Sequence, residues 1–219
     1  MKNKFLRTIL LATTLATCIT GCYSEAEPTV NTEQRRDTYL VLVNKDNELP
    51  ANWQQKVQIY EVENSSGKKV YVEGEASEQF QQLQGELLAE GIQIEAEDAF
   101  RTDDEQQEVY DEYVQKYGTE SAEKYTDLPE YSEHCTGLAI DISIIRNGTE
   151  IHNTDEETIA EISDVLPEYG FILRYPKGKE EITGHRYEPW HLRYVGDTEI
   201  ARKIMQEDLT LEDYLENPQ

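Results

Sequence analysis

The chain has 219 residues and a formal net charge of −25, from 20 lysines and arginines against 45 aspartates and glutamates. A chain of this length can bury one good hydrophobic core, and such a charge disfavours nucleic acid and anionic membrane surfaces as partners. We interpret the acidic surface as the solvated exterior of an exported protein, which we expect to be a monomer.

The N-terminal segment has the features of a lipoprotein signal. Three basic residues precede an apolar run at 9–20, which is too short to span a bilayer. The run ends in Ile-Thr-Gly-Cys, which resembles a bacterial lipobox, where the cysteine receives diacylglycerol. We therefore predict a signal peptide over 1–21, lipid attachment at Cys22, and an extracytoplasmic protein anchored by lipid to the cell membrane. An ordinary cleaved signal is the alternative.

The cysteine count excludes a disulfide in the mature domain. Cys18 lies in the predicted signal and Cys22 at its end, so Cys135 is the only remaining thiol. A nucleophilic Cys135 activated by the adjacent His134 is disfavoured, because neighbours in a strand point to opposite faces.

The chain after Cys22 divides into a tether and one domain. Residues 22–37 are polar and aperiodic, which predicts a flexible tether, and the domain is expected over 38–219. Its strands are predicted at 38–44, 57–62, 69–72, 92–95, 138–144, 171–175 and 190–195. Its helices are predicted at 77–90, 102–117, 154–169, 197–206 and 210–215.

Two of these helices carry specific signals. Phe80, Leu83, Leu87 and Leu88 share one face of the first helix, and a Thr-Asp-Asp-Glu capping box opens the second at residue 102. The second helix is expected to turn Val109, Tyr113 and Val114 inward. Helices and strands follow one another without regular alternation. This order predicts an α+β single domain with a central antiparallel sheet flanked by helices.

Two of the four histidines lie in segments that also carry acids. Residues 131–141 supply His134 and Asp141, and residues 188–191 supply Glu188 and His191. A catalytic zinc site consists of three protein ligands, one open position for water, and a base that accepts the proton of that water. The same residues also fit ordinary, internally satisfied polar groups, and the spacing alone leaves both readings open.

Strand geometry sets a condition on that site. His134 and Asp141 are seven residues apart, so a straight strand would place them on opposite faces. A bend at Gly137 would bring them together, since glycine adopts backbone conformations that other residues avoid. In the second segment His191 and Arg193 share one face, where Arg193 could orient a carboxylate or a substrate group.

The two segments also resemble a known signature. The pattern S-x-H-x-x-G-x-A-x-D at 132–141, followed by E-x-x-H at 188–191, is similar to that of the zinc D-alanyl-D-alanine carboxypeptidases of the vancomycin-resistance type. These enzymes belong to the group named after lysostaphin, the D-Ala-D-Ala peptidases and the hedgehog fold. The resemblance extends over about 38–196, and it includes the segments 39–50, 99–102 and 169–176.

The resemblance implies a zinc cofactor and a hydrolytic mechanism. It implies zinc ligands His134, Asp141 and His191, with Glu188 as the catalytic base. It implies an activity that removes the terminal D-Ala from peptidoglycan stem peptides or their precursors, on a D,D-peptidase-like fold.

The resemblance also implies residues that contact the substrate. Arg101 matches a family arginine near the substrate, where it could hold the substrate carboxylate or the developing oxyanion. Ser132 and Gln106 match positions that line the pocket. Cys135 and Phe100 depart from the residues common in relatives, glutamine and tyrosine. Neither departure touches a ligand or the base, so they put substrate preference in question rather than activity.

Other functions remain as alternatives. An L,D-carboxypeptidase or a cell-wall endopeptidase would use the same scaffold, but Arg101 and Arg193 favour a carboxypeptidase, which needs a cation for a free carboxyl terminus. A non-catalytic cell-wall-binding lipoprotein is a different class of protein. It is disfavoured because Glu188 accompanies all three ligands. An extracellular metal-binding or solute-binding lipoprotein fits the acidic charge but not the placed ligands.

Overall fold

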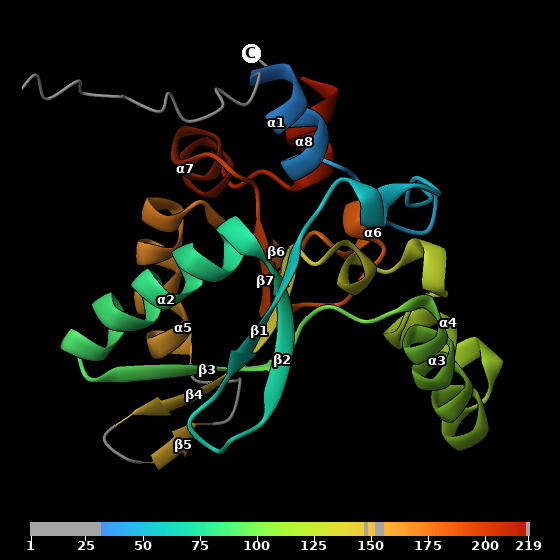
Figure 1. Cartoon of the computed structure of the whole chain (residues 1–219), viewed down its shortest axis with the longest axis horizontal. Coiled ribbons are helices and arrows are strands. Elements are labelled where there is room, and N and C mark those ends of the chain that lie inside the picture. The colour runs from blue at the N-terminus through green and yellow to red at the C-terminus, as the bar shows by residue number, and fades with distance from the viewer. Residues whose placement is uncertain (1–31, 147–148, 152–155, 218–219) are drawn as a thin grey trace, which may run out of the picture. The chain divides into compact units, whose positions relative to one another are not determined.

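The structure, a computed structural model, describes residues 32–146, 149–151 and 156–217. Its centre is a five-stranded antiparallel sheet in the order β3-β4-β7-β6, with β5 paired to β4 (Figure 1). A separate hairpin pairs β1 with β2. The strands are β1 (Ile59–Glu63), β2 (Lys69–Glu73), β3 (Ile92–Asp98), β4 (Ala139–Arg146), β5 (Thr149–Ile151), β6 (Phe171–Tyr175) and β7 (Glu188–Tyr194).

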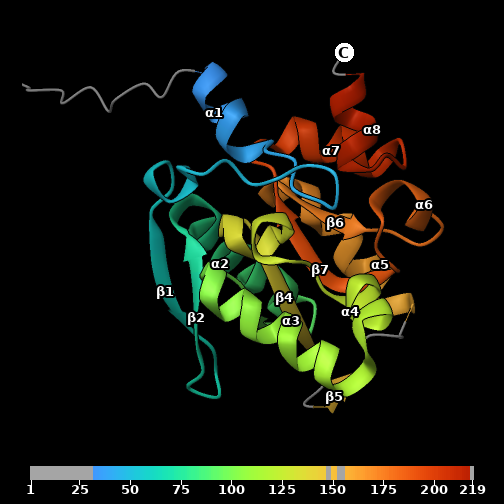
Figure 2. The same cartoon turned by 90° about the vertical axis from the view of Figure 1, so that its right-hand side faces the viewer.

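Helices cover both faces of this sheet. Helices α2 and α5 pack on one face, while α3 and α4 lie on the other side, as Figures 1 and 2 show. Helices α1, α7 and α8 gather at one end of the sheet. The helices are α1 (Thr32–Tyr39), α2 (Gly74–Ala89), α3 (Asp103–Tyr117), α4 (Thr119–Tyr125), α5 (Glu156–Val165), α6 (Glu180–Thr183), α7 (Thr198–Gln206) and α8 (Leu211–Glu216).

The main core lies between the sheet and helices α2 and α5. Phe80, Leu83 and Leu87 of α2 are buried there with apolar residues of β3 and β4, as the spacing predicted. Leu88 was expected on the same face, but it is 59% exposed, so that assignment was wrong. Successive helical residues are 100° apart, and burial of Leu87 turns its neighbour toward solvent.

The predicted α+β fold with an antiparallel sheet is confirmed, with shifted element boundaries. The capping box at Thr102 is present, and it starts α3 as predicted. Val109, Tyr113 and Val114 are only partly buried, because α3 covers a pocket rather than the core. The predicted helix at 154–169 is α5 followed by a 3-10 turn at Leu166–Tyr169, where Pro167 interrupts the helical pattern.

The prediction of a strand at 38–44 was wrong, and so was the tether boundary at 37. The chain is helical over Thr32–Tyr39, and Arg35 donates to the Glu75 carboxylate and to the Gly196 carbonyl. The carbonyls of Tyr39 and Val41 accept hydrogen bonds from the buried Arg193 guanidinium. A side chain therefore satisfies the backbone groups that a neighbouring strand would otherwise bind. Cys22 and the predicted signal lie outside the described residues.

Candidate metal centre and active site

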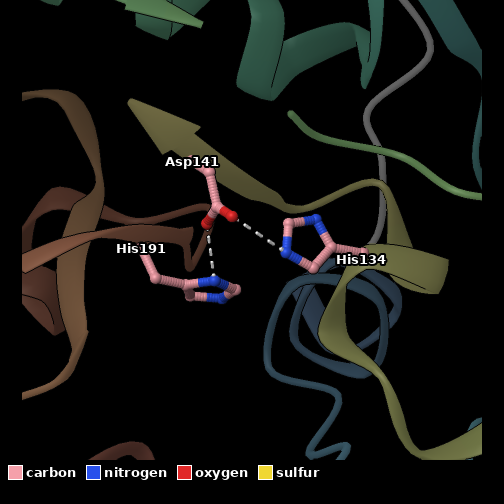
Figure 3. Close-up of side chains that lie close together, drawn as sticks. All are labelled: His134, Asp141 and His191. Atoms are coloured by element: carbon pink, nitrogen blue, oxygen red, sulfur yellow. Dashed lines mark ion pairs between the residues drawn. The ribbon is translucent and has the colours of Figure 1, made fainter. Parts of the chain in front are cut away.

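Three side chains that the sequence singled out lie close together beside the neighbouring strands β4 and β7. One ligand atom from each of His134, Asp141 and His191 lies within 4.8 Å of the others. Figure 3 shows the Asp141 carboxylate facing both imidazole rings. The Asp141 carboxylate lies between the two rings. Its Oδ1 is 2.9 Å from Nδ1 of His191, and its Oδ2 is 3.5 Å from Nε2 of His134.

The sheet register and one bend produce this meeting. Asp141 and His191 are paired residues of the antiparallel strands β4 and β7, so their side chains share one face. His134 lies in a 3-10 turn at Glu133–Thr136, outside the strand. Gly137 ends that turn with a φ of 76°, which is in the left-handed region that favours glycine. The predicted bend at Gly137 is confirmed.

The backbone fixes the orientation of the His134 ring. Its Nδ1 is 2.6 Å from the Ala99 carbonyl, an acceptor, so Nδ1 carries the proton and donates. The other ring nitrogen, Nε2, faces Asp141. A metal ligand held through its other nitrogen in this way has one available lone pair in a defined direction.

A buried acid lies behind the His191 ring. Nε2 of His191 is 3.5 Å from Oε2 of Glu133, whose other oxygen accepts 2.6 Å hydrogen bonds from Arg174 and Arg193. Glu133 and both arginines are almost completely buried. This carboxylate orients His191 so that Nδ1 points toward Asp141, which is the arrangement of a carboxylate–histidine–metal site.

Charge within the cluster favours a cation. Burial alone would raise the pKa of the Asp141 carboxyl, but His134 and His191 hold that pKa well below its ordinary value. Burial alone would lower the pKa of His191, yet the nearby carboxylates of Asp141 and Glu133 raise it to about 10. The raised pKa of His191 records the negative potential of Asp141 and Glu133, which also attracts a divalent cation. The lowered pKa of Asp141 keeps its carboxylate ionised, as a metal ligand must be.

The residues present fit a zinc ion. Two imidazole nitrogens and one carboxylate oxygen form a common catalytic zinc ligand set. Oδ1 of Asp141 is buried, and among the described residues it has no hydrogen bond of good geometry, although His191 lies close to it. A buried acceptor without such a bond costs free energy unless a ligand satisfies it, and a cation between the three residues would do so.

A pocket adjoins the cluster. It is lined by the three candidate ligands and by Glu188, Arg101 and Ser132, among others. Glu188 begins β7 and is mostly buried, and its Oε1 accepts from Nε of Arg186 at 3.3 Å. Glu188 is not part of the three-residue cluster, but it lines the same pocket.

Comparison with known proteins assigns the family. A family model described as VanY, D-alanyl-D-alanine carboxypeptidase, matches residues 69–197. The chain belongs to this family. It is 34% identical over 181 residues to the bifunctional D-Ala-D-Ala dipeptidase and D-Ala-D-Ala carboxypeptidase VanXYC of Enterococcus gallinarum, covering 80% of this chain and 92% of that protein.

Solved structures agree with this assignment. A vancomycin-resistance D,D-pentapeptidase VanY, solved as a mutant with Zn(II), is 36% identical with a TM-score of 0.69, and the match covers 81% of this chain and 98% of that one. The LD-carboxypeptidase LdcB is 39% identical with a TM-score of 0.70, covering 80% of this chain and 84% of that one. The hedgehog/D,D-peptidase-like fold expected from the sequence is therefore confirmed by the D,D-peptidase neighbours.

Arg193 does not have the substrate-binding role expected for it. Its side chain is fully buried and donates to Glu133 and to the carbonyls of Tyr39, Val41 and Tyr194. It is absent from the pocket lining. Arg193 shares a face with His191, as predicted, but on that face the buried Glu133 takes the place of a substrate group.

Gln106 supports the pocket rather than lining it. It is fully buried, and its Oε1 accepts from Nη1 of Arg101 at 2.7 Å and from Oγ of Ser132 at 3.2 Å. Arg101 also bonds Asp98 through Nε and Nη2. Gln106 therefore positions two residues that do line the pocket, and the prediction of direct substrate contact by Gln106 was wrong.

Two acids at the site and the role of one histidine were not predicted from the sequence. Glu133 adjoins His134, and an acid beside a candidate ligand could have suggested its supporting role. Asp127 and His185 line the pocket as well. Cys135 is fully buried, and burial raises the pKa of its thiol to about 12, so it is no nucleophile.

Proposed function

We propose that this chain is a zinc-dependent D-alanyl-D-alanine carboxypeptidase that removes the terminal D-Ala from peptidoglycan stem peptides. The observation that carries this proposal is the convergence of His134, Asp141 and His191 in one pocket with a separate carboxylate, Glu188. A non-catalytic wall-binding protein would have no use for a base beside a complete ligand set.

His134, Asp141 and His191 would hold the metal through Nε2, the carboxylate and Nδ1 respectively. When bound there, zinc polarises the scissile carbonyl and lowers the pKa of a water molecule toward neutrality. The neutral tautomer of His134 is set by Ala99, and Glu133 holds the His191 ring. These contacts keep the two ligand nitrogens directed at one point, so little rearrangement is needed on binding.

Glu188 is proposed as the general base. Its carboxylate accepts the proton of the attacking water and returns it to the amine of the departing D-Ala. Pro189 follows it in β7, and Arg186 contacts its Oε1, so the carboxylate has a defined orientation at the pocket wall. A base three residues before His191 thereby reaches the reaction site without being one of the clustered ligands.

Arg101 is proposed to bind the terminal carboxylate of the substrate. A carboxypeptidase must recognise a free carboxyl terminus, and with Arg193 excluded the arginines that line the pocket in the described structure are Arg101 and Arg186. A guanidinium has five N–H donors, and the contacts to Asp98 and Gln106 leave some of those of Arg101 for a ligand. Ser132, which lies beside it, is proposed to contribute its hydroxyl.

A second candidate function is L,D-carboxypeptidase activity, because the LD-carboxypeptidase LdcB is 39% identical to this chain. Mass spectrometry of pentapeptide and tetrapeptide stems incubated with the protein separates the two. Loss of one D-Ala from the pentapeptide alone supports the D,D activity. Cleavage of the tetrapeptide alone shows the L,D activity, and cleavage within longer cross-linked peptides shows an endopeptidase.

The protein acts on the cell wall, and we propose that lipid at Cys22 keeps it at the outer face of the membrane. The basic leader, short apolar run and lipobox-like residues support this anchor. No helix in the described part of the chain is long and apolar enough to cross a membrane.

A further inference from the structure

The pocket contains a second polar pair that the proposed mechanism does not use. His185 and Asp127 both line it, and Nε2 of His185 is 3.3 Å from Oδ2 of Asp127. Both side chains are mostly buried, with 8% and 11% of their surfaces exposed. Their contact lacks hydrogen-bond geometry, and Nε2 of His185 has no hydrogen-bond partner among the described residues.

The His185 ring is held in place by stacking. It lies parallel to the ring of Tyr175 at a centroid distance of 4.2 Å, and Tyr175 in turn contacts His191 at 4.8 Å. Thr183 holds the backbone of His185 on both sides, through its N–H and its carbonyl. The ring of Tyr175 therefore contacts both the imidazole of His185 and that of the candidate metal ligand His191. Nε2 of His185 lies at the pocket wall without a hydrogen-bond partner among the described residues.

Asp127 is positioned together with Arg101. The Asp127 carbonyl accepts from Nε2 of Gln106 at 2.8 Å, while Oε1 of the same amide accepts from Arg101 at 2.7 Å. One buried glutamine thus places an anion and a cation in the same pocket. Within the described structure no residue donates a well-formed hydrogen bond to the Asp127 carboxylate, so most of its acceptor capacity is available.

We propose that Asp127, with His185 beside it, binds a nitrogen hydrogen-bond donor of the substrate on the N-terminal side of the scissile bond. This inference rests on the proposed function, in which Arg101 takes the carboxylate at the other end. An ionised carboxylate is an acceptor only, so its natural partner in a D-Ala-D-Ala terminus is nitrogen. That nitrogen is either the amide N–H of the penultimate residue or the ammonium of a free dipeptide.

Three substrates distinguish these sources. The first is an N-acyl-D-Ala-D-Ala peptide. The second replaces its penultimate D-Ala by D-lactate, which exchanges the one N–H for an ester oxygen and leaves the scissile amide intact. The third is free D-Ala-D-Ala. Release of D-Ala is measured to obtain kcat/KM on each substrate. The enzymes compared are the wild type, Asp127→Ala, Asp127→Asn and His185→Phe. Phenylalanine keeps a ring on Tyr175 and removes Nε2. Glu130→Gln, an exposed charge change on the same loop outside the pocket, is the matched control.

If the amide N–H is the donor, the wild-type enzyme should prefer the amide over the ester by about tenfold or more, as for a hydrogen bond to a charged group. Asp127→Ala should abolish that preference by losing activity on the amide alone. Asp127→Asn and His185→Phe should reduce it partly, and Glu130→Gln should leave it unchanged. If ammonium is the donor, the selective loss should fall on the free dipeptide instead.

The proposal is overturned if Asp127→Ala changes all three substrates equally or changes none. Zinc content and circular dichroism of each variant show whether the fold and the metal site are retained. Calorimetric binding of the three peptides in a Glu188→Gln background gives the same comparison without turnover. The role of Asp127 is therefore tested even if the proposed reaction is not observed.

Discussion

Replacing Glu133 by glutamine should destabilise the domain and weaken the metal site together. Glu133 is 1% exposed, and its Oε1 is shared by Arg174 and Arg193, which are both fully buried. Burial alone would raise its pKa, but the two arginines hold that pKa well below the ordinary value, so the carboxylate is charged at neutral pH. Removing one charge from a buried ion pair costs about 3–5 kcal/mol because its partner is left uncompensated.

The structure indicates which cation is left without a partner. Arg174 also bonds Glu212 of α8, whereas Arg193 has only carbonyl acceptors besides Glu133. Most of the loss should therefore come from Arg193. The control is Glu212→Gln at the outer end of the same network. It should cost about 1–3 kcal/mol, because Arg174 keeps Glu133.

Urea unfolding in the presence of chelator measures the stability of the metal-free protein, and zinc competition with a chromophoric chelator measures affinity separately. Loss of the partner that orients His191 should weaken zinc binding about 10–100-fold in Glu133→Gln, and Glu212→Gln should not change it. Unfolding of Glu133→Gln at the wild-type urea concentration, or equal zinc affinity of the two variants, would contradict these roles of Glu133.

Three further predictions follow from the same site and from the leader. Glu188→Gln should keep its zinc but lose about 10²–10⁴-fold in turnover; loss of the metal would instead make Glu188 a ligand. The pKa of His191 is raised to about 10 in the metal-free protein, so the ring is protonated at pH 8 and zinc must displace that proton. Zinc affinity should therefore fall as pH is lowered, and calorimetry in buffers of different ionisation enthalpy should show proton release; no net release would contradict the shift. Cys22→Ser should remove the lipid and release the protein from the membrane. Unchanged membrane retention and an unchanged N-terminal mass would contradict lipid attachment at Cys22.

The sequence was sufficient for the parts of the site that follow from local geometry. The odd spacing of His134 and Asp141 required a bend, and Gly137 provides it with a positive φ. The capping box at Thr102 starts α3 for a reason contained in four residues. The resemblance to a known signature then added roles that spacing alone could not assign.

What the sequence could not show depends on long-range contacts. A run such as 38–44 has strand propensity, but the buried Arg193, more than 150 positions later, takes its carbonyls. The role of Arg193 itself was hidden for the same reason, since alternation gives the face of a strand and not what occupies that face. Burial of Glu133 and the pairing of Asp127 with His185 likewise join elements that are distant in the chain.

The central claim is that one metal ion, bound by His134, Asp141 and His191, is required for removal of a terminal D-Ala. The most direct measurement titrates zinc into chelator-treated protein and follows D-Ala release from a D-Ala-D-Ala-terminated stem peptide by mass spectrometry. We predict that the rate rises in proportion to bound zinc and reaches its maximum at one ion per chain. Release that persists in metal-free protein, or zinc that binds fully without any release, would contradict this account.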